Sequence, residues 1–233
     1  HNPRPSNTPP SQSSRQRLAL SILPDVVFVD GDASGPGNGS AEHPFSTVQQ
    51  GVDSAFGLRN VYVHAVSGPY NENVVLSPNT ILLGSGYPIA GLGGMAYGGN
   101  SIPIVDGMNL GPSITMANNT RVSGFHIRNT GPSYEVYARG DLSDRTEPDL
   151  VSRVGIYAEG ELGNLTLTHN LIEGCSYGAR LEAEGNFSLR FENNIVSYND
   201  RDGLRVSGYG SEDLLLGRGT PLPETTTFDV VLN

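Results

Sequence analysis

The chain has 233 residues, with 30 glycines, 16 prolines and 7% aromatic residues, a composition that excludes a mainly helical protein and favours a turn-rich all-β fold around one sizeable core. Its formal net charge is −10, and all 14 basic residues are arginines. Because phosphate groups bind to basic surfaces, nucleic acid is excluded as an expected partner, and no apolar run is long enough for a membrane-spanning segment.

The chain is expected to begin with a linker at residues 1–25, followed by a single domain at residues 26–233. The segment 1–17 is rich in proline, serine and asparagine and nearly free of apolar side chains, which is typical of a flexible tether. Residues 26–30 (VVFVD) predict a first strand, and the glycine-rich residues 31–40 predict a loop after it.

A short helix is predicted after this loop. Ser46 occupies an N-cap position with Gln49 three residues later, and Val48, Val52 and Ala55 then fall on one helix face. We expect this amphipathic helix to cap the structure that follows, because an open first coil exposes unpaired backbone groups and apolar side chains.

Short alternating runs separated by turns fill the rest of the chain. They predict three brief strands per coil with apolar residues pointing inward, and the final run is expected to continue the same order. The runs are residues 60–64, 73–76, 80–83, 102–105, 113–116, 121–127, 154–158, 165–168, 171–172, 178–181, 187–191, 195–196, 204–206 and 227–232.

Two of these segments are degenerate copies of one another: residues 168–178 (THNLIEGCSYG) and 192–203 (ENNIVSYNDRDG). Asn170 and Asn194 are 24 residues apart, and a period of this size leaves no room for a helix, so it predicts a β-solenoid. An asparagine at a tight turn bonds to local backbone and to its copy in the next coil, so we expect both to be structural. The single cysteine, Cys175, is expected to fill a corner.

Further segments resemble a known family. Residues 28–40 (FVDGDASGPGNGS), 43–52 (HPFSTVQQGV) and 68–74 (GPYNENV) are similar to the opening of bacterial right-handed parallel β-helix proteins of the pectate-lyase-like superfamily, and residues 124–129 (GFHIRN) and 194–199 (NIVSYN) are similar to their coil repeats. The resemblance covers residues 26–233. It implies a right-handed parallel β-helix, secreted or held at the cell surface, that binds or processes polysaccharide. The alternative is a non-catalytic surface or structural module, because this superfamily contains both.

A column of glycines aligns the last coils. Gly155, Gly178 and Gly203 are 23 and 25 residues apart, and a strand period of two then places Ile156, Ala179 and Leu204 in one inward column. We call the six outward residues of these strands the outer strip, and we expect them to be exposed. They form two columns, Tyr157, Arg180 and Arg205 beside Glu159, Glu182 and Ser207.

The outer strip suits an acidic or neutral oligosaccharide, because arginines fork onto carboxylates and an aromatic face stacks on a sugar ring. The competing interpretation is that Arg180 and Arg205 pair with Glu159 and Glu182 in a solvated salt-bridge ladder that contributes little to stability.

A long insertion is predicted beside the outer strip. Gly155 follows Asn129 by 26 positions, whereas Gly203 follows Asn199 by 4 at the corresponding corner, and long loops on rigid scaffolds are common places for binding residues. Its candidate substrate-binding residues are Tyr134 and Tyr137, and its candidate calcium ligands are Asp141, Asp144, Glu147 and Asp149. Their spacing matches no known calcium loop, so calcium is left open as the one candidate cofactor and none is assigned.

Two reaction types remain open. The resemblance implies lyase chemistry with a basic residue, and since the chain has no lysine the candidates are Arg180, Arg205 and Arg201. Glycoside hydrolysis requires two carboxyl groups, for which Asp200 with Asp202, or Glu159 with Glu182, are the candidates.

The end of the chain predicts an open coil. Asn233 follows residues 228–232 much as Asn194 follows its own strand. An open coil presents unpaired backbone to water. We therefore expect that the domain is truncated there, and that further β-helix coils or a second subunit cover it.

Overall fold

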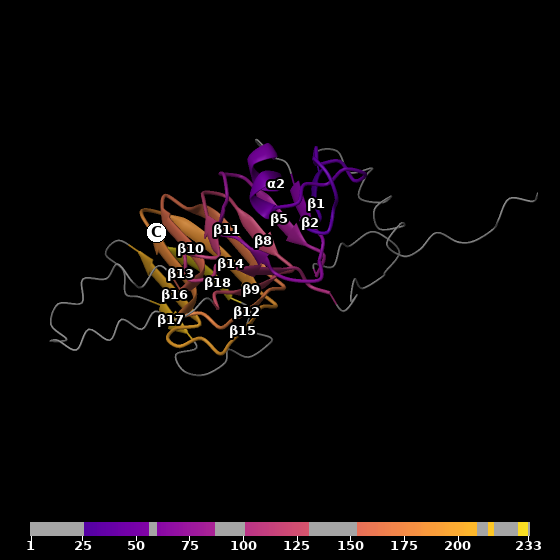
Figure 1. Ribbon diagram of the computed structural model, residues 1–233. Helices are drawn as coiled ribbons and strands as arrows, with labels where there is room; N and C mark the ends of the chain where they lie inside the picture. The colour runs from indigo at the N-terminus through magenta and orange to yellow at the C-terminus, as the bar shows by residue number, and fades with distance from the viewer. Residues whose placement is uncertain are drawn as a thin grey trace, which may run out of the picture.

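The computed structural model describes residues 26–55, 60–86, 101–130, 153–208, 214–216 and 228–232. Over these residues the protein is all-β, with three largely parallel sheets and one helix. Figure 1 shows the strands stacked along one direction, with helix α2 near β1 and β2 at one end and β16 and β17 at the other. The linker expected at residues 1–25 lies outside the described residues.

The strands are distributed over three sheets, here named A, B and C. Sheet A contains, in spatial order, β1 (Val26–Val29), β2 (Asn60–Val63), β5 (Ile81–Gly84), β8 (Arg121–Ser123), β11 (Gly163–Thr168), β14 (Phe187–Glu192) and β18 (Phe228–Leu232). Sheet B contains β3 (Tyr70–Asn71), β6 (Ile104–Asp106), β9 (His126–Arg128), β12 (Leu171–Glu173) and β15 (Ile195–Ser197). Sheet C contains β4 (Val74–Val75), β7 (Ile114–Met116), β10 (Val154–Gly160), β13 (Tyr177–Ala183), β16 (Leu204–Gly208) and β17 (Leu214–Leu216).

The order within the sheets follows a regular rule. From β2 to β13, each strand pairs with the strand three places later in the chain, and these pairs are all parallel. Such an order is compatible with a parallel β-helix, the class that the sequence period predicts.

The last two strands depart from that rule. β17 pairs antiparallel with β16, and β18 pairs antiparallel with β14. Residues 228–232 therefore take the next place in sheet A, beside β14, but the expectation that they continue a parallel coil is wrong for their direction. The alternation in residues 228–232 is compatible with either strand direction, and the chain returns to cover the outer edge of β14 from the opposite direction.

Helix α2 (Val48–Ser54) forms close to its predicted position. Its N-cap is Thr47, whose hydroxyl accepts a hydrogen bond from the Gln50 N–H, and not Ser46 as predicted. The predicted apolar face is confirmed, because Val48, Val52 and Ala55 are all buried.

Helix α2 is also tied to the first strands by polar contacts. The carboxylate of Glu72 accepts from the Val48 and Gln49 N–H groups at 2.9 and 3.0 Å, which satisfies two donors that the first helical turn leaves open. The Gln49 side-chain amide accepts from the Val75 N–H at 2.8 Å and donates to the Val75 carbonyl at 3.2 Å. Because β4 is the edge of sheet C, this amide occupies the place of a neighbouring strand.

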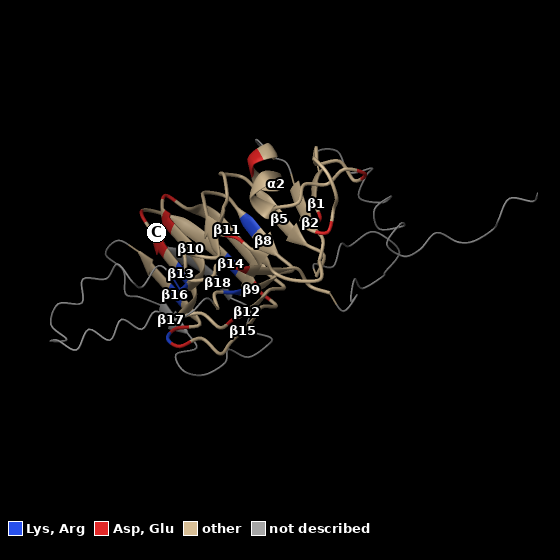
Figure 2. Cartoon of the chain, in the orientation of Figure 1, with Lys and Arg blue, Asp and Glu red and all other residues tan. Residues whose placement is uncertain are grey.

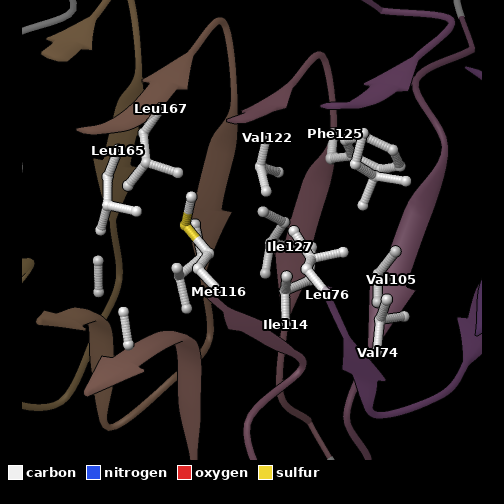
Figure 3. Close-up of a cluster of buried hydrophobic side chains, with 14 of the residues drawn as sticks. Val74, Leu76, Val105, Ile114, Met116, Val122, Phe125, Ile127, Leu165 and Leu167 are labelled. Atoms are coloured by element: carbon white, nitrogen blue, oxygen red, sulfur yellow. The ribbon is translucent and has the colours of Figure 1, made fainter. Parts of the chain in front are cut away.

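The core lies between the three sheets. In Figure 3, side chains from each sheet point toward one another, among them Val122 and Leu167 of sheet A, Ile127 of sheet B, and Ile114 and Met116 of sheet C. All of these are buried, as the alternation of the sequence predicts.

A buried asparagine ladder joins successive turns of the chain. The Asn170 carbonyl oxygen accepts from the Phe125 N–H, and the Asn194 carbonyl oxygen accepts from both the backbone N–H and the side-chain amide of Asn170. Each side-chain amide also donates to a backbone carbonyl, of Val122 from Asn170 and of Leu167 from Asn194. The predicted structural role of Asn170 and Asn194 is confirmed.

The glycine column has a steric cause. A Cβ atom at Gly155 would lie 2.6 Å from the Gly178 carbonyl oxygen, and one at Gly178 would lie 2.4 Å from the Gly203 carbonyl oxygen. The backbones of neighbouring turns therefore approach so closely at this position that only glycine fits.

Gly178→Ala is expected to lower the free energy of unfolding by roughly 1–3 kcal/mol, as overpacked core substitutions do. The new methyl group would meet the Gly203 carbonyl and, at 3.0 Å, the Asn199 side-chain amide. Urea unfolding measures the change. The control is Gly68→Ala, because a Cβ there has no heavy atom within 4 Å, and equal stability of the two variants would contradict the steric argument.

Asn194→Ala is expected to destabilise the protein by roughly 1–3 kcal/mol, because buried groups of Asn170 and Leu167 lose their partner. Asn186→Ala, at an exposed turn residue one strand earlier in the chain, is the matched control. If thermal unfolding shifts by the same amount in both variants, the ladder does not carry the stability assigned to it.

Candidate functional site

The outer strip is assembled in the predicted register. Tyr157 pairs with Arg180 and Arg180 with Arg205, while Glu159 pairs with Glu182 and Glu182 with Ser207. The strip therefore spans β10, β13 and β16 of sheet C. Figure 2 shows basic segments in the region of β13 and β16.

The two faces of these strands are separated as predicted. Ile156, Ala179 and Leu204 are fully buried in the core cluster, whereas the strip residues that alternate with them do not belong to it. The expectation that the whole strip is exposed is wrong: Glu159 is exposed, but Arg180 is only 9% exposed. The other four strip residues, Tyr157, Glu182, Arg205 and Ser207, are half-buried. Glu182 and Tyr177 cover the guanidinium group of Arg180.

Tyr157 links two carboxylates of the strip. Its hydroxyl lies 2.8 Å from a Glu159 oxygen and 3.1 Å from a Glu182 oxygen, and one proton can serve only one of them at a time. Burial raises the pKa of Tyr157 well above its ordinary value, and the two carboxylates raise it further. The phenol is therefore a neutral donor, which positions two acids of neighbouring strands around one hydroxyl.

Arg180 is held from two directions. Its Nε and Nη2 atoms donate to one Glu182 oxygen at 2.8 and 2.6 Å, and its guanidinium carbon lies 5.7 Å from the centre of the Tyr177 ring. Arg201 lies 5.6 Å from the same ring and donates to the Tyr177 hydroxyl. The ion pair Arg180–Glu182 forms within β13, not across neighbouring strands as a ladder requires.

The acids at the corner before β16 differ in their surroundings. Asp200 is exposed and forms an ion pair with Arg153 at 3.1 Å, whereas Asp202 is only 6% exposed. Because Asp202 is buried while Asp200 is exposed, a glycosidic bond could not lie between the two carboxyl groups, so the geometry does not favour these two residues as the carboxyl pair of a hydrolase.

The predicted insertion is described only at its ends. Its candidates, Tyr134, Tyr137, Asp141, Asp144, Glu147 and Asp149, lie outside the described residues. Before it, Thr130 is anchored to Asp106, whose buried carboxylate accepts from the Thr130 N–H and hydroxyl and from Arg128. After it, Arg153 is fixed by the Asp200 ion pair. Both ends of the segment thus start from well-bonded corners beside β10.

Three residues near the strip escaped the sequence analysis: Tyr177, Arg153 and the anchor Asp106. Backbone bonds join the Ser176 N–H to the Arg153 carbonyl and the Arg201 N–H to the Ser176 carbonyl. Arg153, Ser176 and Arg201 each precede one of the aligned glycines by two residues. Extending the alignment of the glycines by two residues toward the N-terminus would therefore have placed Arg153 at this corner. No comparable repeat marks Asp106.

Cys175 lies in the same corner, as predicted. It is fully buried, its N–H donates to the Asn199 side-chain oxygen at 3.1 Å, and burial raises the pKa of its thiol to about 12. A protonated, inaccessible thiol is a packing element and not a nucleophile.

Within the part of the chain that the structure describes, no group of three or more His, Cys, Asp and Glu side chains is arranged to hold a metal ion. The same residues contain no helix of the length and apolar character needed to cross a membrane. Comparisons of the chain with protein-family models, with curated proteins and with solved structures find no match.

The carboxyl group of Asp106 makes the free energy of unfolding depend on pH. Burial alone would raise the pKa of this carboxyl group, but hydrogen bonds from Thr130, Met108 and Arg128 outweigh burial and hold the pKa below its ordinary value. A carboxylate of lowered pKa stabilises the fold fully above about pH 4, and the stabilisation is lost as the pH falls through the lower folded-state value.

Asp106→Asn should therefore reduce the free energy of unfolding at neutral pH and flatten its decline in acid. Urea unfolding measured at several values between about pH 7 and pH 2 checks this. If the wild-type and Asp106→Asn curves stay parallel over that range, Asp106 does not contribute through its charge.

Proposed function

We propose that the protein is a right-handed parallel β-helix with three strands per coil, of the pectate-lyase-like kind, and that its outer strip binds polysaccharide. The repeated order of strands in sheets A, B and C supports the coil, and parallel crossover connections are right-handed in about 98% of cases. We include a location outside the cell or at its surface in the proposal, because the resemblance to the pectate-lyase-like superfamily implies it.

The observation that carries the proposal is the register of Tyr157, Glu159 and Glu182 around one hydroxyl on an outward face. Neighbouring strands lie about 4.8 Å apart, so a linear polymer lying across β10, β13 and β16 meets polar groups at each step. A phenol ring beside carboxylates supports binding of sugar hydroxyls and of the apolar face of a sugar ring.

The charges favour a neutral over an acidic polymer. Arg180 is nearly buried and its charge is taken up by Glu182, whereas Glu159 is exposed and would repel a uronic acid. The burial of Arg180 also argues against it as the base of a lyase, and its Nε and Nη2 atoms already donate to the Glu182 carboxylate.

A glycoside hydrolase is the second candidate, because Glu159 and Glu182 meet at the Tyr157 hydroxyl. Retaining enzymes place their two carboxyl groups about 5–5.5 Å apart, and here both acids lie within hydrogen-bonding distance of the same hydroxyl. A non-catalytic structural module remains the alternative to both, supported by the Arg180–Glu182 ion pair and the asparagine ladder.

One screen separates these three functions. The purified protein is incubated with neutral and acidic polysaccharides, with and without calcium, and retention in affinity gels, reducing ends and unsaturated products are all measured. Retention without product supports binding alone, new reducing ends support hydrolysis, and no retention by any polymer contradicts the proposal.

Tyr157→Phe and Glu159→Gln should each weaken binding of the retained polymer by about 1 kcal/mol, roughly fivefold, since each removes or weakens one hydrogen bond. The matched control is Glu161→Gln, an exposed acid just beyond β10 that is not part of the strip. Isothermal titration calorimetry provides the affinities. Unchanged affinity in the double variant Tyr157→Phe/Glu159→Gln would exclude the strip as the site.

A further inference from the structure

A recess lies at the end of the fold opposite β16, between the glycine-rich loop (residues 31–40) and the side of α2. It is an open cleft of about 470 Å³, within the range of roughly 300–1,000 Å³ that is usual for small-molecule sites. Its walls are residues 35–37 and Phe45 on the loop side, and Ser46, Gln50, Asp53 and Ser54 on the helix side. None of them belongs to the outer strip.

The loop wall is fixed by backbone bonds to β1. The Phe28 N–H donates to Gly39 at 2.9 Å, the Phe45 N–H donates to Phe28 at 2.9 Å, and the Asp30 N–H donates to Phe45 at 2.8 Å. The Phe45 ring packs so closely on Gly39 that a Cβ there would lie 2.7 Å from it. The aromatic side of the cleft is therefore formed before any ligand arrives, which lowers the entropic cost of binding.

The helix wall excludes one class of ligand. The N–H groups of Val48 and Gln49 at the start of α2 already bond to Glu72, so they are not available to an anion. Asp53 is exposed at the cleft, and no lining residue is basic. A phosphate, sulfate or uronic acid would meet a negative charge with no compensating cation.

The same wall offers hydrogen bonds to a neutral ligand. Gln49 donates to Asp53 Oδ1 at 2.7 Å, which orients the carboxylate. The exposed Gln50 amide has only a long 3.5 Å contact with the Ser46 hydroxyl, which a ligand group can replace. A carboxylate, an amide, hydroxyls and a phenylalanine that line one cleft match the vicinal hydroxyls and the apolar ring face of a pyranose.

From this combination we infer that the cleft binds a neutral sugar residue and forms a carbohydrate site separate from the outer strip. Ligand specificity comes from the Gln50 and Asp53 side chains, and the ring of Phe45 provides the apolar contact. The cleft shares no residue with the outer strip, so binding at one site can be tested without the other.

The test is an amide chemical-shift titration of the full chain by NMR with cellotetraose, xylotetraose and mannotetraose, and with tetragalacturonate as the acidic probe. At least one neutral tetrasaccharide should shift the amides of Gly35, Gly37, Gln50 and Asp53 at millimolar concentration. Shifts at Tyr157 and Glu182 report the strip in the same spectra. The inference is overturned if no neutral probe shifts the cleft amides, or if tetragalacturonate shifts them at a lower concentration than every neutral probe.

Two variants sharpen the result. Gln50→Ala and Asp53→Asn should each weaken binding at the cleft by about tenfold, because each alters one hydrogen-bonding group at the ligand, and should leave shifts at the strip unchanged. The control is Glu42→Gln, an exposed acid of the same loop that does not line the cleft. Asp53→Asn keeps the shape of the side chain. Its effect on sugar binding therefore tests the cleft even if Gln50→Ala disturbs the helix. Full affinity in both variants would overturn the inference.

Discussion

The structure depends on the close approach of successive turns of the backbone at their corners. Asn170 and Asn194 bridge this approach with hydrogen bonds, and Gly155 and Gly178 permit it because a side chain there would collide with the next carbonyl. The asparagines cannot be exchanged freely because their buried backbone partners would lose a hydrogen bond. The glycines cannot be exchanged freely because a Cβ atom would collide with the carbonyl oxygen of the next turn. Once these corners are fixed, the register of every strand between them follows.

Register in turn determines what the outer face can do. Because Ile156, Ala179 and Leu204 form one inward column, Tyr157, Arg180 and Arg205 must form one outward column, and a slip of one residue would reverse the two. The chemistry of the strip is then a matter of contacts between neighbouring strands. Tyr157 reaches the acid of the next strand, whereas Arg180 turns to the acid within its own strand.

Much of the scaffold could be predicted from the sequence, because it repeats. The 24-residue offset between Asn170 and Asn194, and the glycine column, led directly to the observed pairing. The burial of Arg180 could not be predicted, since it results from the positions of the Tyr177 ring and the Glu182 carboxylate around one guanidinium. The direction of β18 was equally inaccessible, because an alternating pattern reads the same both ways. The anchor of Thr130 on Asp106 joins residues 24 positions apart outside any visible repeat.

The contact between Gln49 and Val75 protects the protein against aggregation through the exposed edge of sheet C. A parallel stack ends in backbone groups that can be extended by any strand, so two such ends are templates for fibre growth. A single side-chain amide occupies both groups of Val75 on β4, and it is held there by a helix whose first turn is bonded to Glu72. The edge strand β4 is therefore blocked only as long as α2 stays folded, because the blocking side chain belongs to the helix. Local melting of α2 would open the end of the stack together with the part of the core that Val48 and Val52 fill, so colloidal stability can fail at a lower temperature than the remaining sheets unfold.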